Sequence, residues 1–184
     1  MGGYSVFTEK RRDSNYTKIN MVSQKVLKQK DLYLILHNIR SAHNVGAIFR
    51  TADATGVKKI FLTGYTPTPL DKLGKPRGDI AKTALGSQNE VVWEGFNDLT
   101  KLLCEMRKKK IEIIALEQSP DSIDYKKKIL MAPGALLVGN EVRGLSARTL
   151  SKVDSIIEIP MKGKKESLNV SVACGVALFR LLDS

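Results

Sequence analysis

Short apolar segments alternate with helical patterns along most of this chain, and this alternation limits its fold more than any other feature. Three segments of strand length are almost continuously apolar, at 32–36, 111–116 and 135–138. Such strands are typical of parallel sheets with both faces covered. The sequence therefore predicts an α/β protein with a mostly parallel sheet flanked by helices. The remaining predicted strands are 59–63, 91–93 and 155–159.

Helical periodicity separates these strands. Apolar residues recur at helical spacing between Val45 and Gly56 and between Phe96 and Met106. A short helix is expected from Ser146, and a long C-terminal helix over 168–182. Between the second strand and the next lies the segment 64–80, which holds three prolines and three glycines. Irregular loops of this length are usually functional or mobile.

The chain length suits one domain, since 184 residues can bury a real core but do not comfortably make two domains. We expect a flexible basic arm over 1–21 and a single domain over 22–184. No apolar run is long enough to cross a bilayer, and the N-terminus lacks the layout of a secretory signal. Cys104 and Cys174 lie in apolar helical patterns and are expected to be buried, reduced thiols. These features predict a cytoplasmic protein without a structural zinc site or other metal.

The net charge of +11 indicates a polyanionic partner, most often nucleic acid. The alternative is a solvated lysine-rich surface. Lys162, Lys164 and Lys165 carry the most weight, because they lie in a loop that also holds small polar residues.

Three loops follow predicted strands and should meet at one edge of the sheet, where parallel α/β sheets bind their ligands. The first leads to Asn44 and Arg50, the second contains Glu141, and the third ends in Ser167 and Asn169. Together they supply an amide, a guanidinium, a carboxylate and a hydroxyl. Each loop also has a structural interpretation: Asn44 suits a helix N-cap, Arg50 a helix surface, and the glycines of the second loop ordinary turns.

Several familiar nucleotide sites are missing from the sequence. No Gly-x-Gly-x-x-Gly pattern follows a strand, and there is no Walker-type loop. The first two loops hold a single carboxylate, Glu141. Metal-dependent phosphoryl chemistry needs a cluster of carboxylates and is therefore disfavoured.

Taken together, the three loops resemble the motifs of the SpoU/TrmH family of SPOUT RNA 2'-O-ribose methyltransferases. The matching segments are Asn-Val-Gly-Ala-Ile-Phe-Arg-Thr-Ala-Asp-Ala-Thr-Gly-Val at 44–57, Leu-Leu-Val-Gly-Asn-Glu-Val-Arg-Gly-Leu-Ser at 136–146, and the run from Ile157 through Ala173. Ala-Leu-Glu at 115–117 resembles a smaller family signature. The similarity covers about residues 31–182.

The resemblance implies properties that pattern reading does not reach. It implies a C-terminal deep trefoil knot, S-adenosylmethionine as cofactor, a homodimer with its site near the interface, and methyl transfer to a ribose 2'-hydroxyl of structured RNA. The positions that match the catalytic and substrate-positioning set are Asn44, Arg50, Glu141, Ser167 and Asn169. Those that match the cofactor pocket are Leu116, Gly139, Ile159, Met161 and Leu168.

The substrate stays open at this point, with tRNA slightly preferred over rRNA. Arg50 would hold an RNA phosphate or act at the hydroxyl, and Glu141 would fix Arg50 or a neighbouring loop. Two other functions remain: a base-nitrogen methyltransferase of the same fold, and an RNA-binding module without catalysis. A separate RNA-binding domain is not expected, so the arm over 1–21 and the loop over 64–80 are the candidates for RNA recognition.

Overall fold

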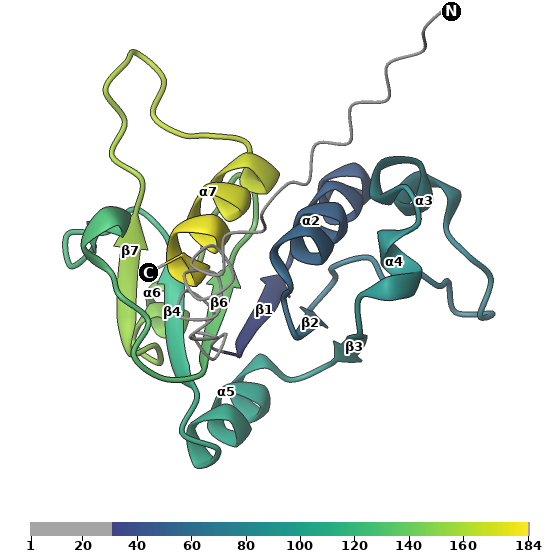
Figure 1. Ribbon diagram of the computed structural model, residues 1–184, viewed down its shortest axis with the longest axis horizontal. Coiled ribbons are helices and arrows are strands. Elements are labelled where there is room, and N and C mark those ends of the chain that lie inside the picture. Colours follow the sequence, from purple (N-terminus) through teal and green to yellow (C-terminus); the bar gives the residue numbers. More distant parts are fainter. Residues whose placement is uncertain (1–30, 184) are drawn as a thin grey trace, which may run out of the picture.

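The computed structural model describes residues 31–183, and within this range seven strands form one sheet (Figure 1). The strands lie in the order β3-β2-β1-β6-β4-β7-β5, and every pair of neighbours in this order is parallel. The predicted parallel α/β sheet is therefore confirmed. The short edge strand β5 was not predicted. The strands are β1 (Leu32–His37), β2 (Lys59–Thr63), β3 (Trp93–Phe96), β4 (Glu112–Leu116), β5 (Ile123–Asp124), β6 (Gly134–Val138) and β7 (Ser155–Glu158).

Helices cover both faces of this sheet. Helices α2 (Ala42–Thr55) and α7 (Val170–Leu182) lie side by side on one face, and α5 (Leu99–Lys108) lies on the other (Figure 1). Successive residues of β1 divide between the two cores: Leu34 and Leu36 pack under α2 and α7, and Ile35 packs under α5. The shorter helices are α3 (Gly78–Ala84), α4 (Ser87–Glu90), α6 (Ala147–Leu150) and the 3-10 turn Tyr125–Lys127.

The first helix after β1 begins earlier than the apolar pattern indicated. Ser41 is its N-cap, because the Ser41 side chain accepts the N–H of Asn44 at 3.3 Å. Gly56 ends the helix in a left-handed conformation with φ of 71°. The interpretation of Asn44 as an N-cap is therefore wrong. Its side chain is left available for other contacts.

Two further predictions about elements need correction. The third strand runs from Trp93 rather than from Val91, because the N–H of Val91 closes α4 on the carbonyl oxygen of Ser87 at 3.0 Å. The segment 64–80 is not irregular throughout, since α3 begins at Gly78. Helix α3 packs closely on α2 at Gly46, where a Cβ atom would lie 2.1 Å from Thr83 Oγ1.

The two cysteines differ in exposure. Cys174 is buried as predicted, and burial raises the pKa of its thiol to about 12. The prediction for Cys104 is wrong, because its side chain is exposed. None of the helices within residues 31–183 has the length and hydropathy that crossing a membrane requires. The predicted arm over 1–21 and the start of the predicted domain, up to residue 30, lie outside the described residues.

Candidate active site

A cavity of about 490 Å³ opens at the carboxyl ends of β4, β6 and β7. All ten predicted site residues lie in the described part of the chain, and nine of them line this cavity. Four belong to the predicted catalytic set and five to the predicted cofactor set. The nine are Asn44, Glu141, Ser167, Asn169, Leu116, Gly139, Ile159, Met161 and Leu168. The fold thus brings residues more than a hundred positions apart to one place, and their chemical roles stay predictions.

A chain of hydrogen bonds joins three of these residues across three elements. The Asn169 amide at the start of α7 donates to the Asn44 side-chain oxygen at 3.1 Å. The Asn44 amide then donates to Glu141 Oε1 at 3.0 Å. Both functional ends of the Asn44 amide are therefore occupied, which fixes its orientation at the edge of the cavity.

Glu141 fixes the loop between β1 and α2. One carboxylate oxygen accepts the N–H of Arg40 at 2.9 Å, and the other accepts the N–H of Ser41 at 3.0 Å. Partial burial raises the pKa of Glu141, but these backbone donors and the Asn44 amide outweigh it and leave the pKa below its ordinary value. Glu141 is therefore a carboxylate at neutral pH. Of the two partners predicted for it, the structure gives the neighbouring loop.

Arg50 does not line the cavity. It lies on α2 six residues after Asn44, which places it about 9 Å further along the helix axis and about 120° around it. The side chain is exposed, and no hydrogen bond or ion pair holds it within residues 31–183. Arg50 was predicted to lie beside the other polar site residues, and within one chain it does not.

Two residues beyond the predicted set shape the cavity. Glu117, directly after β4, accepts the N–H of Leu145 at 2.7 Å, and a Cβ atom on Gly144 would lie 2.2 Å from its carboxylate. Gly144 has φ of 60° and Gly139 packs against Leu145, so both glycines are required by the turn. Asn140 is buried and donates to the backbone oxygen of Asn38 at 3.0 Å. The rule that ligands bind beyond strand ends would have selected Glu117 and Asn140 as well.

The cavity walls are acidic although the protein is basic. Among residues 31–183, four glutamates and one arginine line it: Glu117, Glu141, Glu158, Glu166 and Arg143. Uncharged polar residues such as Asn44 and Asn169 also line it, and its apolar side chains include Leu116, Val138, Ile159 and Leu168. A site of this kind suits a small ligand with an apolar ring and a positive charge.

A parallel sheet with a cavity at its strand ends is typical of ligand-binding α/β proteins, and comparison with known proteins gives the family of this chain. The model of the SpoU rRNA Methylase family matches residues 31–179. This match covers most of the chain, and the chain therefore belongs to the SpoU rRNA Methylase family.

Two curated proteins are similar to this chain in sequence. The chain is 35% identical over 152 residues to the tRNA (guanosine(18)-2'-O)-methyltransferase of Aquifex aeolicus, covering 83% of this chain and 69% of that protein. It is 33% identical over 152 residues to the 23S rRNA (guanosine-2'-O-)-methyltransferase RlmB of Xanthomonas axonopodis, covering 80% of this chain and 57% of that protein. The chain thus spans between 57% and 69% of the length of these two relatives.

Solved structures share the fold. The A. aeolicus TrmH/SpoU tRNA modifying enzyme is 33% identical with a TM-score of 0.72, over 83% of this chain and 74% of that chain. The AdoMet-bound rRNA methyltransferase of Sinorhizobium meliloti is 28% identical with a TM-score of 0.73, over 83% and 56% of the two chains.

Proposed function

We propose that this protein transfers a methyl group from S-adenosylmethionine to a ribose 2'-hydroxyl of RNA. The observation that carries the proposal is the cavity, where three distant segments of the chain meet beside a hydrogen-bonded Asn44 and Glu141. Relatives named as tRNA and 23S rRNA 2'-O-methyltransferases support both the reaction and the kind of substrate. They also favour ribose over a base nitrogen as the acceptor. We keep tRNA and rRNA as the two substrate classes.

The residues of the cavity fit this cofactor. A volume of about 490 Å³ lies in the usual range for small-molecule sites. Leu116, Ile159, Met161 and Leu168 provide apolar surface for the adenine ring. The carboxylates of the wall favour a positively charged ligand over a neutral one. Gly139 leaves its backbone open on the wall, and no side chain could be added there without displacing Leu145.

When bound, the cofactor supplies an electrophilic methyl group on a cationic sulfur. The chain must hold the acceptor hydroxyl in line and stabilise the negative charge that grows on its oxygen, and positioning of this kind can supply about 7–11 kcal/mol in ideal cases. Ser167 and Asn169 stand at the start of α7, on the cavity wall, where they can orient the hydroxyl. A guanidinium is a poor proton acceptor, so we assign Arg50 to holding an RNA phosphate and stabilising charge, and the hydroxyl proton passes to solvent water.

We also propose that the active unit is a homodimer whose site takes Arg50 from the second copy. Arg50 is exposed and unpaired within residues 31–183, and it lies too far along α2 to line the cavity of its own chain. Apolar side chains on the neighbouring α7 are half exposed, with Val172 at 51% and Phe179 at 52%. An interface over these helices would cover them and bring Arg50 toward a partner's cavity.

The shared site has a direct test. Mixed dimers of Arg50→Ala and Glu141→Ala should regain part of the activity that both parent variants lack, because one of the two sites is then intact. Sedimentation should give a dimer for the wild type. Mixed dimers without activity would show that each site uses Arg50 from its own chain.

A deep trefoil knot in the last third of the chain is a further part of the proposal. Strand β7 lies beyond β4, and the segment 159–169 then returns to α7, which packs against α2 and β6 (Figure 1). Pulling the chain from both ends of the described range tests this arrangement. A knotted chain should extend less than its residue count allows, and full extension would exclude the knot.

The cytoplasmic location stays a prediction.

The reaction itself is tested by incubating the protein with methyl-labelled cofactor and total RNA and then mapping the label. We expect label on the ribose of one or a few nucleotides. The mapped RNA is then prepared with a 2'-deoxy sugar at that nucleotide as a control, and it should accept no methyl group. Label that persists on the deoxy substrate would identify a base methyltransferase. Cofactor uptake without any label on RNA would contradict the proposed reaction.

A further inference from the structure

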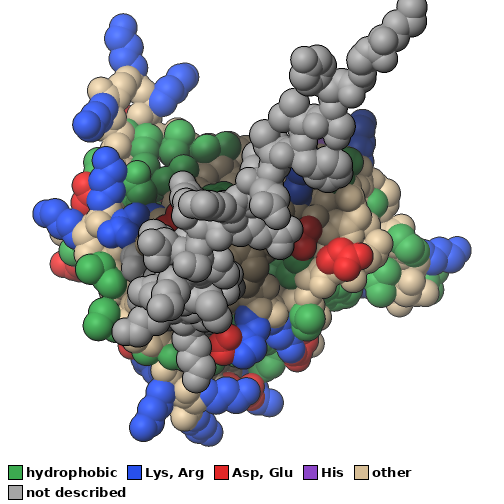
Figure 2. All heavy atoms as spheres, in the orientation of Figure 1, with side chains coloured by type: hydrophobic (Ala, Val, Ile, Leu, Met, Phe, Trp, Pro, Cys, Tyr) green, Lys and Arg blue, Asp and Glu red, His purple; other side chains and the backbone are tan. Residues whose placement is uncertain are grey.

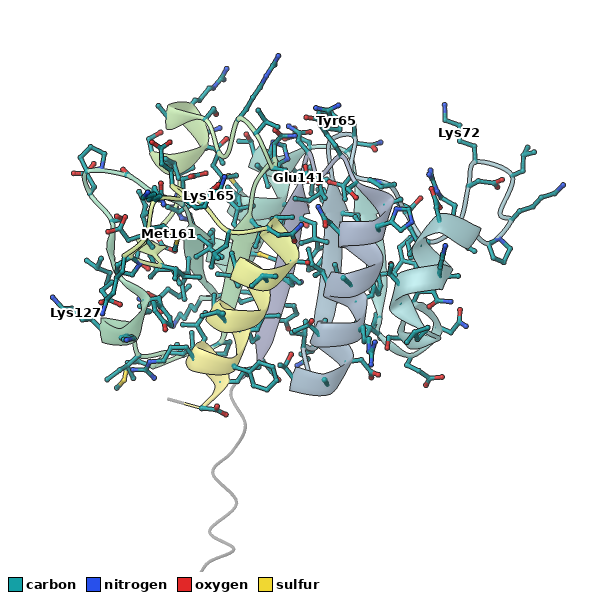
Figure 3. The ribbon with its side chains drawn as sticks, turned by 90° about the horizontal axis from the view of Figure 1, so that it is seen from above. Tyr65, Lys72, Lys127, Glu141, Met161 and Lys165 are labelled. Carbon is teal, nitrogen blue, oxygen red and sulfur yellow. The ribbon has the colours of Figure 1, made fainter. Side chains whose placement is uncertain are left out.

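An exposed tyrosine stands at the edge of the cavity and has no role in the proposed chemistry. Tyr65 follows β2 and is 60% exposed, which is high for a large aromatic residue. In Figure 3 it lies close to Glu141 along the same edge of the molecule. Its hydroxyl accepts a hydrogen bond from the Asn140 amide at 3.1 Å, and Asn140 lines the cavity.

Contacts of the backbone of Tyr65 and of its two neighbours in the sequence, Gly64 and Thr66, hold this segment in place. The N–H of Tyr65 donates to Asn38 Oδ1 at 3.2 Å, and Gly64 before it has φ of 66° in close contact with Asn38. Thr66 after it is buried, and its hydroxyl accepts the N–H of Ile39 at 3.0 Å. The hydrogen bond from the Asn140 amide holds the hydroxyl end of the ring at the cavity edge, while the residue as a whole stays exposed to solvent.

Two arginines are joined through their backbone N–H groups to polar residues at the same edge of the cavity. Asn140 Oδ1 accepts the N–H of Arg143 at 2.8 Å, and Glu141 accepts the N–H of Arg40 at 2.9 Å. Both side chains are exposed, and neither guanidinium has a hydrogen bond or ion pair within the described range 31–183. A fixed, exposed aromatic ring and two exposed arginines on adjoining loops match the recognition of unpaired nucleotides, where bases stack on aromatic rings and phosphates meet arginines.

We propose that Tyr65 is the stacking platform for an unpaired base of the substrate RNA next to the reacting ribose. The inference rests on the proposed function, because it assigns a substrate contact to the same site. The ring supplies the binding surface, and its hydroxyl serves to hold the ring beside the cavity. Tyr65 is therefore a positioning residue that acts on RNA and not on the cofactor.

Three variants of the full chain separate stacking from the hydroxyl contact. Tyr65→Phe and Tyr65→Trp keep an aromatic face, whereas Tyr65→Leu keeps only apolar bulk. The probe is a fluorescently labelled single-stranded oligoadenylate, with affinity read by anisotropy at low salt. We expect Tyr65→Phe and Tyr65→Trp to bind like the wild type and Tyr65→Leu to bind about 5- to 150-fold more weakly, as for one lost base stack.

In methyl transfer to the RNA that the wild type modifies, the loss in Tyr65→Leu should lie in KM rather than kcat. Its affinity for the product S-adenosylhomocysteine and its melting temperature should stay at wild-type values. Equal RNA binding by Tyr65→Leu and the wild type would overturn the platform, and so would an equal loss in Tyr65→Phe. Failure of the wild type to bind the oligoadenylate, or weakened cofactor binding or folding in Tyr65→Leu, would overturn it too. Absence of methyl transfer by a wild type that binds the probe would instead count against the proposed function alone.

Discussion

The walls of the cavity and the loops around its mouth differ in charge. The walls carry four glutamates and one arginine among the described residues. The surrounding loops carry exposed cations instead: Arg40 after β1, and Lys162, Lys164 and Lys165 between β7 and α7. Figure 2 shows basic side chains gathered over this last loop, and Figure 3 places Lys165 near Met161. The same edge of the sheet therefore has an acidic cavity that suits a cationic ligand and basic loops around it that suit a polyanion.

This separation has a physical reason. A buried carboxylate wall would repel phosphates, and a lysine-lined pocket would repel a sulfonium. Glu141 stands at the boundary, since it lines the cavity and also holds the N–H groups of Arg40 and Ser41. The two regions are therefore close in space but can be disturbed separately.

The largest expected effect removes the chemistry and leaves both binding regions in place. Arg50→Ala should lower kcat about 10²- to 10³-fold, because charge on the acceptor oxygen loses its stabilising cation. Cofactor affinity, measured by calorimetry, should hardly change, since the residues assigned to cofactor binding line the cavity and do not include Arg50. Arg148→Ala on α6 is the matched control, an exposed arginine outside this cavity, and should keep full activity. Unchanged turnover in Arg50→Ala would defeat the assignment.

A second substitution disturbs the packing of α3 on α2, the helix that carries Asn44 and Arg50. Gly46→Ala places a Cβ atom 2.1 Å from Thr83 Oγ1 and 2.4 Å from the carbonyl oxygen of Ile80, so α3 must move away from α2. We expect a loss of about 1–3 kcal/mol in the free energy of unfolding, measured by chemical denaturation. Gly175→Ala on α7 is the control, because its Cβ atom would meet Thr51 Cγ2 at 3.4 Å and should be tolerated. Equal stability of the two variants would contradict the close packing.

Salt should distinguish the two regions. Binding of RNA displaces counterions, and for three neutralised phosphates the affinity should fall about 20- to 40-fold between about 50 and 200 mM salt. Cofactor affinity should fall much less, because the cofactor carries a single positive charge and three of the four glutamates around it are partly buried, which weakens screening. Parallel anisotropy and calorimetric titrations measure both slopes. Equal salt dependence of RNA and cofactor affinity would contradict the separation into an acidic cavity wall and basic surrounding loops.

The smallest effect concerns the residue at the boundary. The folded-state pKa of Glu141 is lowered, so its contribution to stability is present above the unfolded pKa and is lost as the pH falls through the folded pKa. Glu141→Gln should therefore cost about 1 kcal/mol or less at neutral pH, given partial exposure to solvent. The difference from the wild type should shrink as the pH falls through the lowered folded-state pKa of Glu141. Denaturation at neutral and acid pH measures it, and a constant difference would contradict the linkage.

Single residues show where sequence patterns stop being informative. The apolar type of Cys104 predicted burial, but α5 buries Leu102, Leu103 and Met106, and position 104 turns away from that side of the helix. The sequence suits Asn44 both as the N-cap of α2 and as a site residue. The structure makes Ser41 the N-cap, so the Asn44 side chain is available to the site. Apolar spacing does not define a helix start to within three residues, so it could not distinguish the two roles.

The sequence by itself determined the parallel α/β sheet, the position of its main strands and the three strand-end loops, because apolar periodicity and strand-end placement are local signals. The tertiary structure decided which side chains touch: that Glu141 binds the Arg40 loop, that Asn169 reaches Asn44, and that Arg50 stays outside the cavity. These contacts join residues about a hundred positions apart. Their distances follow from how helices pack on the sheet, which no local pattern records.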